Sequence, residues 1–447
     1  MPSAASARPL DVPATRTRGA SPHDTYLFAL CWVLAGYAVL GRGFAAIGLP
    51  PLYIGELSLL AGVVVLLRTR CWLALPATPA CLILLVLMVW VVLRTVPYVG
   101  PYGIDALRDS VVILYGLFAL VVIALVVEDP RRLAWIVSLY ARFAWLYGII
   151  GGALFIGSVF LAERLPQAPI QLPYVRPGEA ATHLAGAAVF VLLGLRRVTL
   201  VWCVLLVVSM VLVSASRAAM LACLIPVVLA IVLGGHLRRV LPVLIVGAVM
   251  LGLGAAVDLQ IPLPGGRDIG TAQILNGLAS VFGTNEASNF EGTKEFRLRW
   301  WAIIQDYTLR GPYFWTGKGF GVNLALEDGY AQWVTQDSVL RSPHNGHMTI
   351  LARAGVPGLA LWIGLLAAWF AMLLRSHLLA RQAGDATWAA VFLWIACYGT
   401  AVLVNASFDV ALEGPMSGIW FWSLFGLGVG ASMTYRADLR SLLDDAR

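Results

Sequence analysis

Long apolar stretches recur along most of the sequence. We place apolar helices near residues 26–41, 46–67, 79–93, 110–127, 133–161, 182–195, 198–215, 218–234, 240–257, 346–374, 387–406 and 416–434. A helix satisfies its own backbone hydrogen bonds in lipid, whereas a β-barrel would need apolar and polar residues to alternate. Because about 20 apolar residues in helical form cross a bilayer, the pattern predicts an all-α polytopic membrane protein with about 12 transmembrane helices.

The composition supports a lipid environment and excludes several functions. Of the 447 residues, 60% are hydrophobic and 12% are charged, against roughly 25% charged residues in an ordinary soluble domain. The net charge is +7, but the basic residues are scattered in ones and twos, which argues against nucleic-acid binding. The six cysteines fall in or beside apolar runs without metal-ligand or secreted-domain spacing. Disulfides and a cysteine nucleophile are therefore not expected.

The arginines fix the expected orientation. If the N-terminus is cytoplasmic, every cytoplasmic segment is short and basic, as the positive-inside rule requires. These segments carry Arg68 and Arg70, Arg131 and Arg132, Arg196 and Arg197, Arg238 and Arg239, Arg375 and Arg381, and finally Arg436, Arg440 and Arg447. We therefore expect both termini to be cytoplasmic, with a cytoplasmic tail over residues 1–25 and a transmembrane domain over residues 26–447.

This orientation leaves one long segment outside, over residues 258–343. It begins with turn residues, has helical spacing over 291–309 and is turn-rich over 311–321. Its tryptophans argue against disorder and could also seat it at the membrane interface. We predict a large periplasmic loop with helical segments, inserted before the helix at 346–374.

Several basic residues break the positive-inside pattern by lying outside or at the outer ends of helices: Arg176, Arg217, Arg297, Arg299, Lys318 and Arg341. Arg217 lies between two apolar runs. There it either snorkels to the membrane interface from a short turn or forms an anion site, because the guanidinium fork matches phosphate geometry. The glycine-rich stretch at 317–321 lacks the strand context of a nucleotide-binding loop, so we interpret it as a tight turn.

Two histidines lie where the loop meets the helix at 346–374. His344 and His347 are one helical turn apart. A histidine here could act as a base or acid near neutral pH. The two could instead form a metal pair, although no third ligand follows at a recognised spacing, or they could belong to a polar helix cap.

These residues together resemble the O-antigen ligase and polymerase superfamily. His344-Asn345, nine further residues, and then Gly355-Val356-Pro357-Gly358 match its pattern of a histidine, a small polar residue and two spaced glycines. Ser216-Arg217 at the end of an apolar run, Arg297 four residues before Trp301, and Glu413-Gly414-Pro415 before the last helix agree with it. The resemblance covers the second half of the chain well, and the first half only in helix number and topology.

The resemblance implies a metal-independent, inverting glycosyltransferase without a cofactor, in the bacterial inner membrane. Its donor is expected to be a glycan linked to undecaprenyl diphosphate, used on the periplasmic face. The acceptor is a lipid A core sugar in a ligase or a growing polysaccharide in a polymerase. By resemblance, His344 is the general base, Arg217 and Arg297 bind the diphosphate, and Arg299, Arg341 and Asn345 are further substrate-binding candidates.

The alternative from another class is a transporter or permease for a lipid-linked or polysaccharide substrate, which would also have many helices and a few buried charges. Against it, the two halves show no internal repeat, and the unusual residues cluster outside instead of at mid-membrane.

Overall fold

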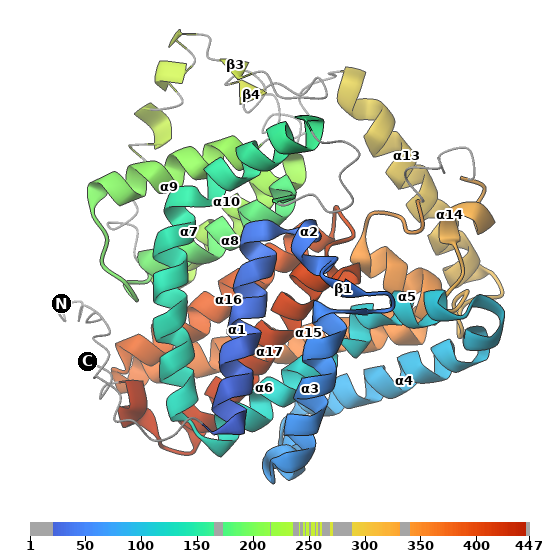
Figure 1. Ribbon diagram of the computed structural model, residues 1–447, viewed down its shortest axis with the longest axis horizontal. Helices are drawn as coiled ribbons and strands as arrows, with labels where there is room; N and C mark the ends of the chain where they lie inside the picture. Colours follow the sequence, from blue (N-terminus) through green and yellow to red (C-terminus); the bar gives the residue numbers. More distant parts are fainter. Residues whose placement is uncertain are drawn as a thin grey trace.

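The structure of the chain is a computed structural model. It describes residues 21–164, 173–214, 216–235, 288–330 and 340–443, together with short pieces between 241 and 270. Helices dominate these residues (Figure 1). Seven of the described helices are long and apolar enough to cross a membrane, or up to nine spans if each of two bent helix pairs counts as one. The prediction of an all-α polytopic membrane protein is confirmed.

The first half of the chain contains α1 (Pro22–Leu40), α2 (Arg42–Ala45), α3 (Ile54–Arg68), the short 3-10 helix η1 (Cys71–Ala77), α4 (Pro79–Tyr102), α5 (Ile104–Leu114), α6 (Gly116–Glu128), α7 (Arg131–Arg164), α8 (Pro177–Leu192) and α9 (Leu200–Val213). The second half contains α10 (Arg217–Gly234), α13 (Ser288–Gln305), the π-helical turn η2 (Asp306–Arg310), α14 (Leu324–Glu327), α15 (Gly346–Ala383), α16 (Ala386–Ala406), η4 (Ala411–Glu413), α17 (Pro415–Arg436) and η5 (Arg440–Leu443). Two antiparallel hairpins pair β1 (Gly48–Leu49) with β2 (Leu52–Tyr53) and β3 (Gln260–Ile261) with β4 (Ile269–Gly270).

Each predicted apolar helix has a counterpart except the one near 240–257, which lies largely outside the described residues. Some boundaries were wrong. The helix predicted from 46 begins at Ile54, because Pro50 and Pro51 lie in a hairpin turn that a helix interior would not tolerate. The helix predicted to end at 374 continues to Ala383, since arginine is a good helix former. The expected helices at 291–309 and turns at 311–321 are present.

The innermost helices are α16 and α17, whose side chains are almost all buried. α17 packs along α6, and α16 packs against α8, α10 and α15. The α6 contact requires a small residue, because a Cβ on Gly426 would come within 2.5 Å of the Ala119 carbonyl oxygen. Peripheral helices expose apolar side chains such as Leu67 and Val232 outward. Such a surface is what a lipid-facing bundle presents.

Helix α15 is broken at Gly355, where φ is +71°. The backbone of Phe314 passes close by, and a Cβ on residue 355 would lie 2.6 Å from its carbonyl oxygen. The Val356 N–H donates to that same carbonyl at 2.8 Å. Pro357 has no N–H to continue the helical ladder. The first spaced glycine of the sequence pattern therefore marks a kink that only glycine accommodates without strain.

Three carbonyls of α15 beside the kink accept hydrogen bonds from outside the helix. Two of the donors are backbone N–H groups of the glycine-rich segment 317–321, and the third is a tryptophan indole of α4. The Ala352, Arg353 and Ala354 carbonyls bind Lys318 N (2.7 Å), Gly319 N (3.0 Å) and Trp90 Nε1 (2.9 Å) respectively. These contacts satisfy acceptors that a broken helix would leave buried and unpaired. The glycine-rich segment 317–321 thus stabilises α15, the helix that begins two residues after His344.

Candidate active site at the loop end of the bundle

Several helix ends meet at one end of the bundle. The Arg42 N–H, just after α1, donates to the Tyr174 carbonyl just before α8 at 2.9 Å. The Cys223 thiol in the second turn of α10 donates to the Ala181 carbonyl in the second turn of α8 at 3.6 Å, so the early turns of these two helices lie side by side. Gly178, near the start of α8, packs against Asn405 in the last turn of α16, because a Cβ on Gly178 would come within 2.1 Å of the Asn405 side-chain oxygen. The last turn of α16 therefore lies at the same end of the bundle. We call this region the loop end.

His344 lies at the loop end beside an aspartate that is distant in sequence. The His344 Nδ1 is 3.5 Å from Oδ1 of Asp409, which follows α16. His344 has φ +51°, an unusual conformation for a residue other than glycine. Such strain concentrates at functional sites. With Nδ1 facing the carboxylate, Nε2 points away from it, and the side chain is 32% exposed.

The Asp409 carboxylate is held by further contacts. Nη1 of Arg176, immediately before α8, lies 3.3 Å from each carboxylate oxygen, and the Val410 N–H donates to Oδ1 at 2.8 Å. Burial alone would raise the pKa of Asp409. His344, Arg176 and Val410 together outweigh burial and hold the pKa at about 2. Asp409 is therefore an anion at any physiological pH and provides a fixed negative charge beside the imidazole.

One face of α13 bridges the two segments that carry this pair. Arg297 Nη1 donates to the Phe408 carbonyl at 3.0 Å, and Trp301 Nε1 donates to the Pro343 carbonyl at 2.9 Å. Residues four apart lie on the same helix face, and the accepting carbonyls directly precede Asp409 and His344. The spacing of Arg297 and Trp301 thus aligns the histidine with its carboxylate.

The Arg297 guanidinium keeps donors available for a ligand. Within the described part of the chain, its one hydrogen bond is to the Phe408 carbonyl, and a guanidinium has five N–H groups. Burial lowers the pKa of Arg297, and the negative charge of Asp409 acts in the opposite direction. Arginine remains protonated in proteins. The side chain therefore places a partly desolvated positive charge beside the His344–Asp409 pair.

Arg217 lies at the same end of the bundle. It is the first residue of α10, follows the N-cap Ser216, and is half-buried. The early turns of its helix lie beside those of α8, whose preceding residue Arg176 binds Asp409. The positive end of the α10 dipole reinforces its charge.

Arg299 is not brought to the pair. Its guanidinium forms an ion pair with Glu295 one turn earlier in α13, and both side chains are more than half exposed. The neighbouring Arg297 is instead half-buried. The two arginines predicted for one pocket therefore lie on different faces of the helix.

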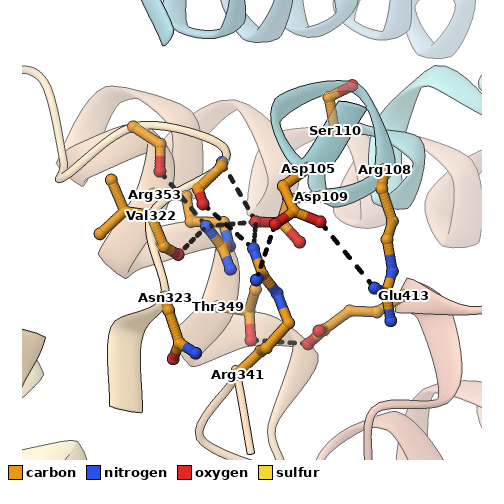
Figure 2. Close-up of polar contacts among 12 residues, drawn as sticks. Asp105, Arg108, Asp109, Ser110, Val322, Asn323, Arg341, Thr349, Arg353 and Glu413 are labelled. Carbon is orange, nitrogen blue, oxygen red and sulfur yellow. Dashed lines mark hydrogen bonds and ion pairs between the residues drawn. The ribbon is translucent and has the colours of Figure 1, made fainter. Parts of the chain in front are cut away.

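Arg341 belongs to a separate ionic cluster with α5 and α15 (Figure 2). Its Nη1 is 3.1 Å from Asp105, its Nη2 is 3.1 Å from Asp109, and Asp109 also lies 2.9 Å from Nη1 of Arg353. Arg353 is 1% exposed. A charge buried this deeply requires partners. Arg341 thus attaches the segment before His344 to α5. Its guanidinium contacts carboxylates of the protein itself.

Asn345 has a local structural role. It is the N-cap of α15, and its side-chain oxygen accepts from the N–H groups of His347 (2.9 Å) and Met348 (3.1 Å). Asparagine is a favoured N-cap because it satisfies donors that the first helical turn leaves unpaired. One turn on, the Thr349 hydroxyl donates to Glu413 at 2.7 Å, which ties the start of α15 to η4.

The two histidines do not form a metal pair. Both ring nitrogens of His347 are engaged by other side chains: Nδ1 by Trp362 at 2.9 Å and Nε2 by Ser407 at 3.1 Å. A metal ligand needs a free ring nitrogen. Among the described residues, no group of three or more His, Cys, Asp and Glu side chains could hold a metal ion.

Asp409 is a candidate site residue that no sequence motif indicated. It lies 65 positions from His344, beyond any local motif. One signal was available: an acidic residue stands just after the apolar run at 387–406, where a charge next to lipid needs a partner. Arg176, its strongest cationic partner, was already conspicuous as an outer arginine.

The fold and this site define a polytopic α-helical membrane protein with a histidine–carboxylate pair and arginines at one end. Residues 201–363 match the family model described as O-antigen ligase. The match confirms the resemblance to the O-antigen ligase family over these residues. It spans Arg217, Arg297, His344 and both spaced glycines, and it stops before Asp409. No curated protein matches the chain.

The family match and the apolar helices together indicate a bacterial membrane protein with an O-antigen ligase-like role in glycan transfer. A ligase- or polymerase-type glycosyltransferase acts on a lipid-linked glycan and an acceptor, and the membrane setting fits both substrates.

Proposed function

We propose that the protein transfers a glycan from undecaprenyl diphosphate to a sugar hydroxyl, with His344 as general base and with inversion at the anomeric carbon. The observation that carries this proposal is the His344–Asp409 contact at the loop end, beside the half-buried Arg297.

The geometry of His344 suits proton abstraction. A neutral imidazole whose Nδ1–H faces a carboxylate presents its Nε2 lone pair to the substrate, and the carboxylate stabilises the imidazolium that forms. The 3.5 Å contact is longer than an ordinary hydrogen bond. Catalytic hydrogen bonds are often long without substrate and shorten when it binds. Asp409 therefore orients the base and prepares it to accept a positive charge.

In the proposed step, the acceptor O–H gives its proton to Nε2 of His344 while its oxygen attacks the anomeric carbon. The bond from that carbon to the diphosphate oxygen breaks, and the diphosphate leaves with the electron pair. Attack from the face opposite the leaving group inverts the configuration. Each proton and electron pair is accounted for without an oxidant or a second co-substrate.

Arg297 and Arg217 are the proposed ligands of the diphosphate. Its negative charge grows as the glycosidic bond breaks, and fixed guanidiniums stabilise that charge in the transition state. Arginine also binds phosphate oxygens with two parallel hydrogen bonds. Two such residues supply the charge that a divalent cation would otherwise provide, which supports a metal-independent reaction.

We further propose that the loop end faces the periplasm and that both termini lie in the cytoplasm of a bacterium's inner membrane. The basic segments between helices support this orientation. Labelling with a membrane-impermeant thiol reagent tests it: a cysteine at Ser288 should react from outside, and one at Arg131 should not. The reverse pattern would contradict both the orientation and the periplasmic reaction.

Transfer by the purified protein in nanodiscs tests the function. A defined undecaprenyl-diphosphate glycan is offered with a lipid A core acceptor or with a second undecaprenyl-linked repeat, with and without EDTA. Product with the first acceptor identifies a ligase, and product with the second identifies a polymerase. Absence of product with both, alongside vectorial movement of the intact donor across a vesicle membrane, would favour a transporter instead.

A suitable control replaces another histidine that contacts a carboxylate. His23 contacts Glu128 at 2.8 Å, at the start of α1, whereas the end of α1 lies at the loop end. His23→Ala should therefore keep the transfer activity of the parent protein.

A further inference from the structure

His347 follows His344 by one turn but faces a different set of side chains. The indole Nε1–H of Trp362, in α15 beyond the kink, donates to His347 Nδ1 at 2.9 Å. His347 Nε2 lies 3.1 Å from Oγ of Ser407, the C-cap of α16. The Ser407 hydroxyl donates in turn to the Leu403 carbonyl at 2.9 Å.

The directions of these hydrogen bonds determine the tautomer of His347. An indole nitrogen can only donate, so His347 Nδ1 must be the acceptor and cannot carry a proton. The Ser407 hydroxyl hydrogen points to Leu403, so the Ser407 oxygen is the acceptor for Nε2–H. The neutral Nε2–H tautomer is the form that satisfies all three bonds. Trp362 is fully buried, which gives its N–H no access to water as a substitute partner.

The His347–Ser407 hydrogen bond links the segment that carries His344 to the segment that carries Asp409. Ser407 precedes Asp409 by two residues, and His347 follows His344 by three. α13 holds the backbone of the same two segments through Arg297 and Trp301. The His347–Ser407 bond is a second, independent link between α15 and the end of α16. A shift of α16 along α15 would change it together with the His344–Asp409 contact.

We propose that His347 is a positioning residue that sets the distance between His344 and Asp409 through Ser407. This inference rests on the proposed function, in which that pair is the base. His347 itself does not touch the substrate, because both of its ring nitrogens are committed to Trp362 and Ser407. Its contribution is to hold Asp409 where it can orient the His344 ring.

The test compares two substitutions of His347. His347→Leu removes both hydrogen bonds, whereas His347→Gln retains an amide oxygen for Trp362 and an N–H group for Ser407. A matched control is Ser376→Ala, which also removes a buried hydrogen bond from α15, to Ser432 of α17 at 3.0 Å. We expect His347→Leu to lower kcat by about 10-fold at unchanged KM for the donor, because the base is misaligned while the arginines are intact. Glutamine should restore most of kcat.

A double mutant separates positioning from general stability. If His347 acts through Asp409, then His347→Leu should cost less than about 2-fold once Asp409→Asn is present, because residues that act as a unit are not additive. Equal losses in both backgrounds, or a kcat loss that glutamine does not reverse, would overturn the proposal. Loss of folded protein in proportion to activity would overturn it as well.

A measurement without turnover distinguishes this inference from the proposed function. In ¹⁵N spectra of histidine-labelled protein in nanodiscs, His347 should show the Nε2–H tautomer, and His347→Leu should shift the His344 nitrogen signals while Ser376→Ala should not. Unchanged His344 signals would refute the positioning role even if transfer is observed. Shifted signals in a protein that transfers no glycan would refute the proposed function and leave the coupling intact.

Discussion

Replacing Asp409 by asparagine is the change that most directly separates the orienting carboxylate from the base. It removes the charge and keeps the size of the side chain. The lowering of the Asp409 pKa from its ordinary 3.8 to about 2 corresponds to about 2 kcal/mol in favour of the carboxylate. His344, Arg176 and the Val410 N–H share this stabilisation.

The expected loss of transfer rate depends on how much of this stabilisation acts on the His344 imidazole. If about half of the stabilisation acts on the His344 imidazolium in the transition state, transfer should slow by about 5-fold. An asparagine N–H turned toward Nδ1 would also hold the tautomer with a proton on Nε2, which adds to the loss.

Initial rates of glycan transfer by the purified protein, measured at saturating donor, give the comparison. Donor affinity should change little, because the proposed diphosphate ligands are arginines that remain in place. A matched substitution is Glu128→Gln, which also removes a carboxylate that contacts a histidine and an arginine, His23 and Arg132, but at the end of the bundle where α1 begins. Parental transfer rates for Asp409→Asn would refute the orienting role. A loss confined to donor affinity would refute it as well and would assign Asp409 to binding.

Three further predictions concern the pH dependence of Asp409 and the roles of the arginines. Because the folded-state pKa of Asp409 is depressed, its stabilising contribution is present above about pH 4 and is lost as the pH falls toward 2; the Tm difference between the parent and Asp409→Asn should shrink over that range, and a constant difference would contradict the sign. Arg217→Ala and Arg297→Ala should each weaken transfer by about 10²-fold or more, with only partial rescue by lysine, which lacks the bidentate fork; normal rates in both alanine variants would remove them from the site. Arg341→Met leaves Asp109 with one fewer partner and should lower the free energy of unfolding by about 1.5–3 kcal/mol, the usual contribution of hydrogen bonds to charged groups; unaltered thermal unfolding with lost donor affinity would return Arg341 to the diphosphate site.

The sequence predicted the helices well because lipid imposes a simple rule on them. A run of apolar residues long enough to cross a bilayer must be helical. Boundaries were predicted poorly where polar residues continued a helix, as at Arg375 in α15. No sequence pattern indicated the 42° bend between α5 and α6.

The candidate site was only partly predictable, since its contacts join residues far apart in the chain. Family resemblance identified His344 and Arg297, which the structure brings to one place. It could not separate Arg297 from Arg299, because their different exposure depends on which face of α13 packs inward. Asp409 was missed for the same reason, since its importance comes from a contact with His344 and not from its neighbours in sequence.

His344 is the proposed general base of a glycan transfer. The most direct measurement is the transfer rate of purified His344→Ala, compared with the parent protein at equal amounts of folded protein and in the presence of EDTA. We expect the parent to remain active with EDTA and His344→Ala to be slower by about 10²–10⁴-fold, the usual contribution of general base catalysis, while it still binds the lipid-linked donor. A His344→Ala protein as fast as the parent, or a parent that EDTA inactivates, would contradict this expectation.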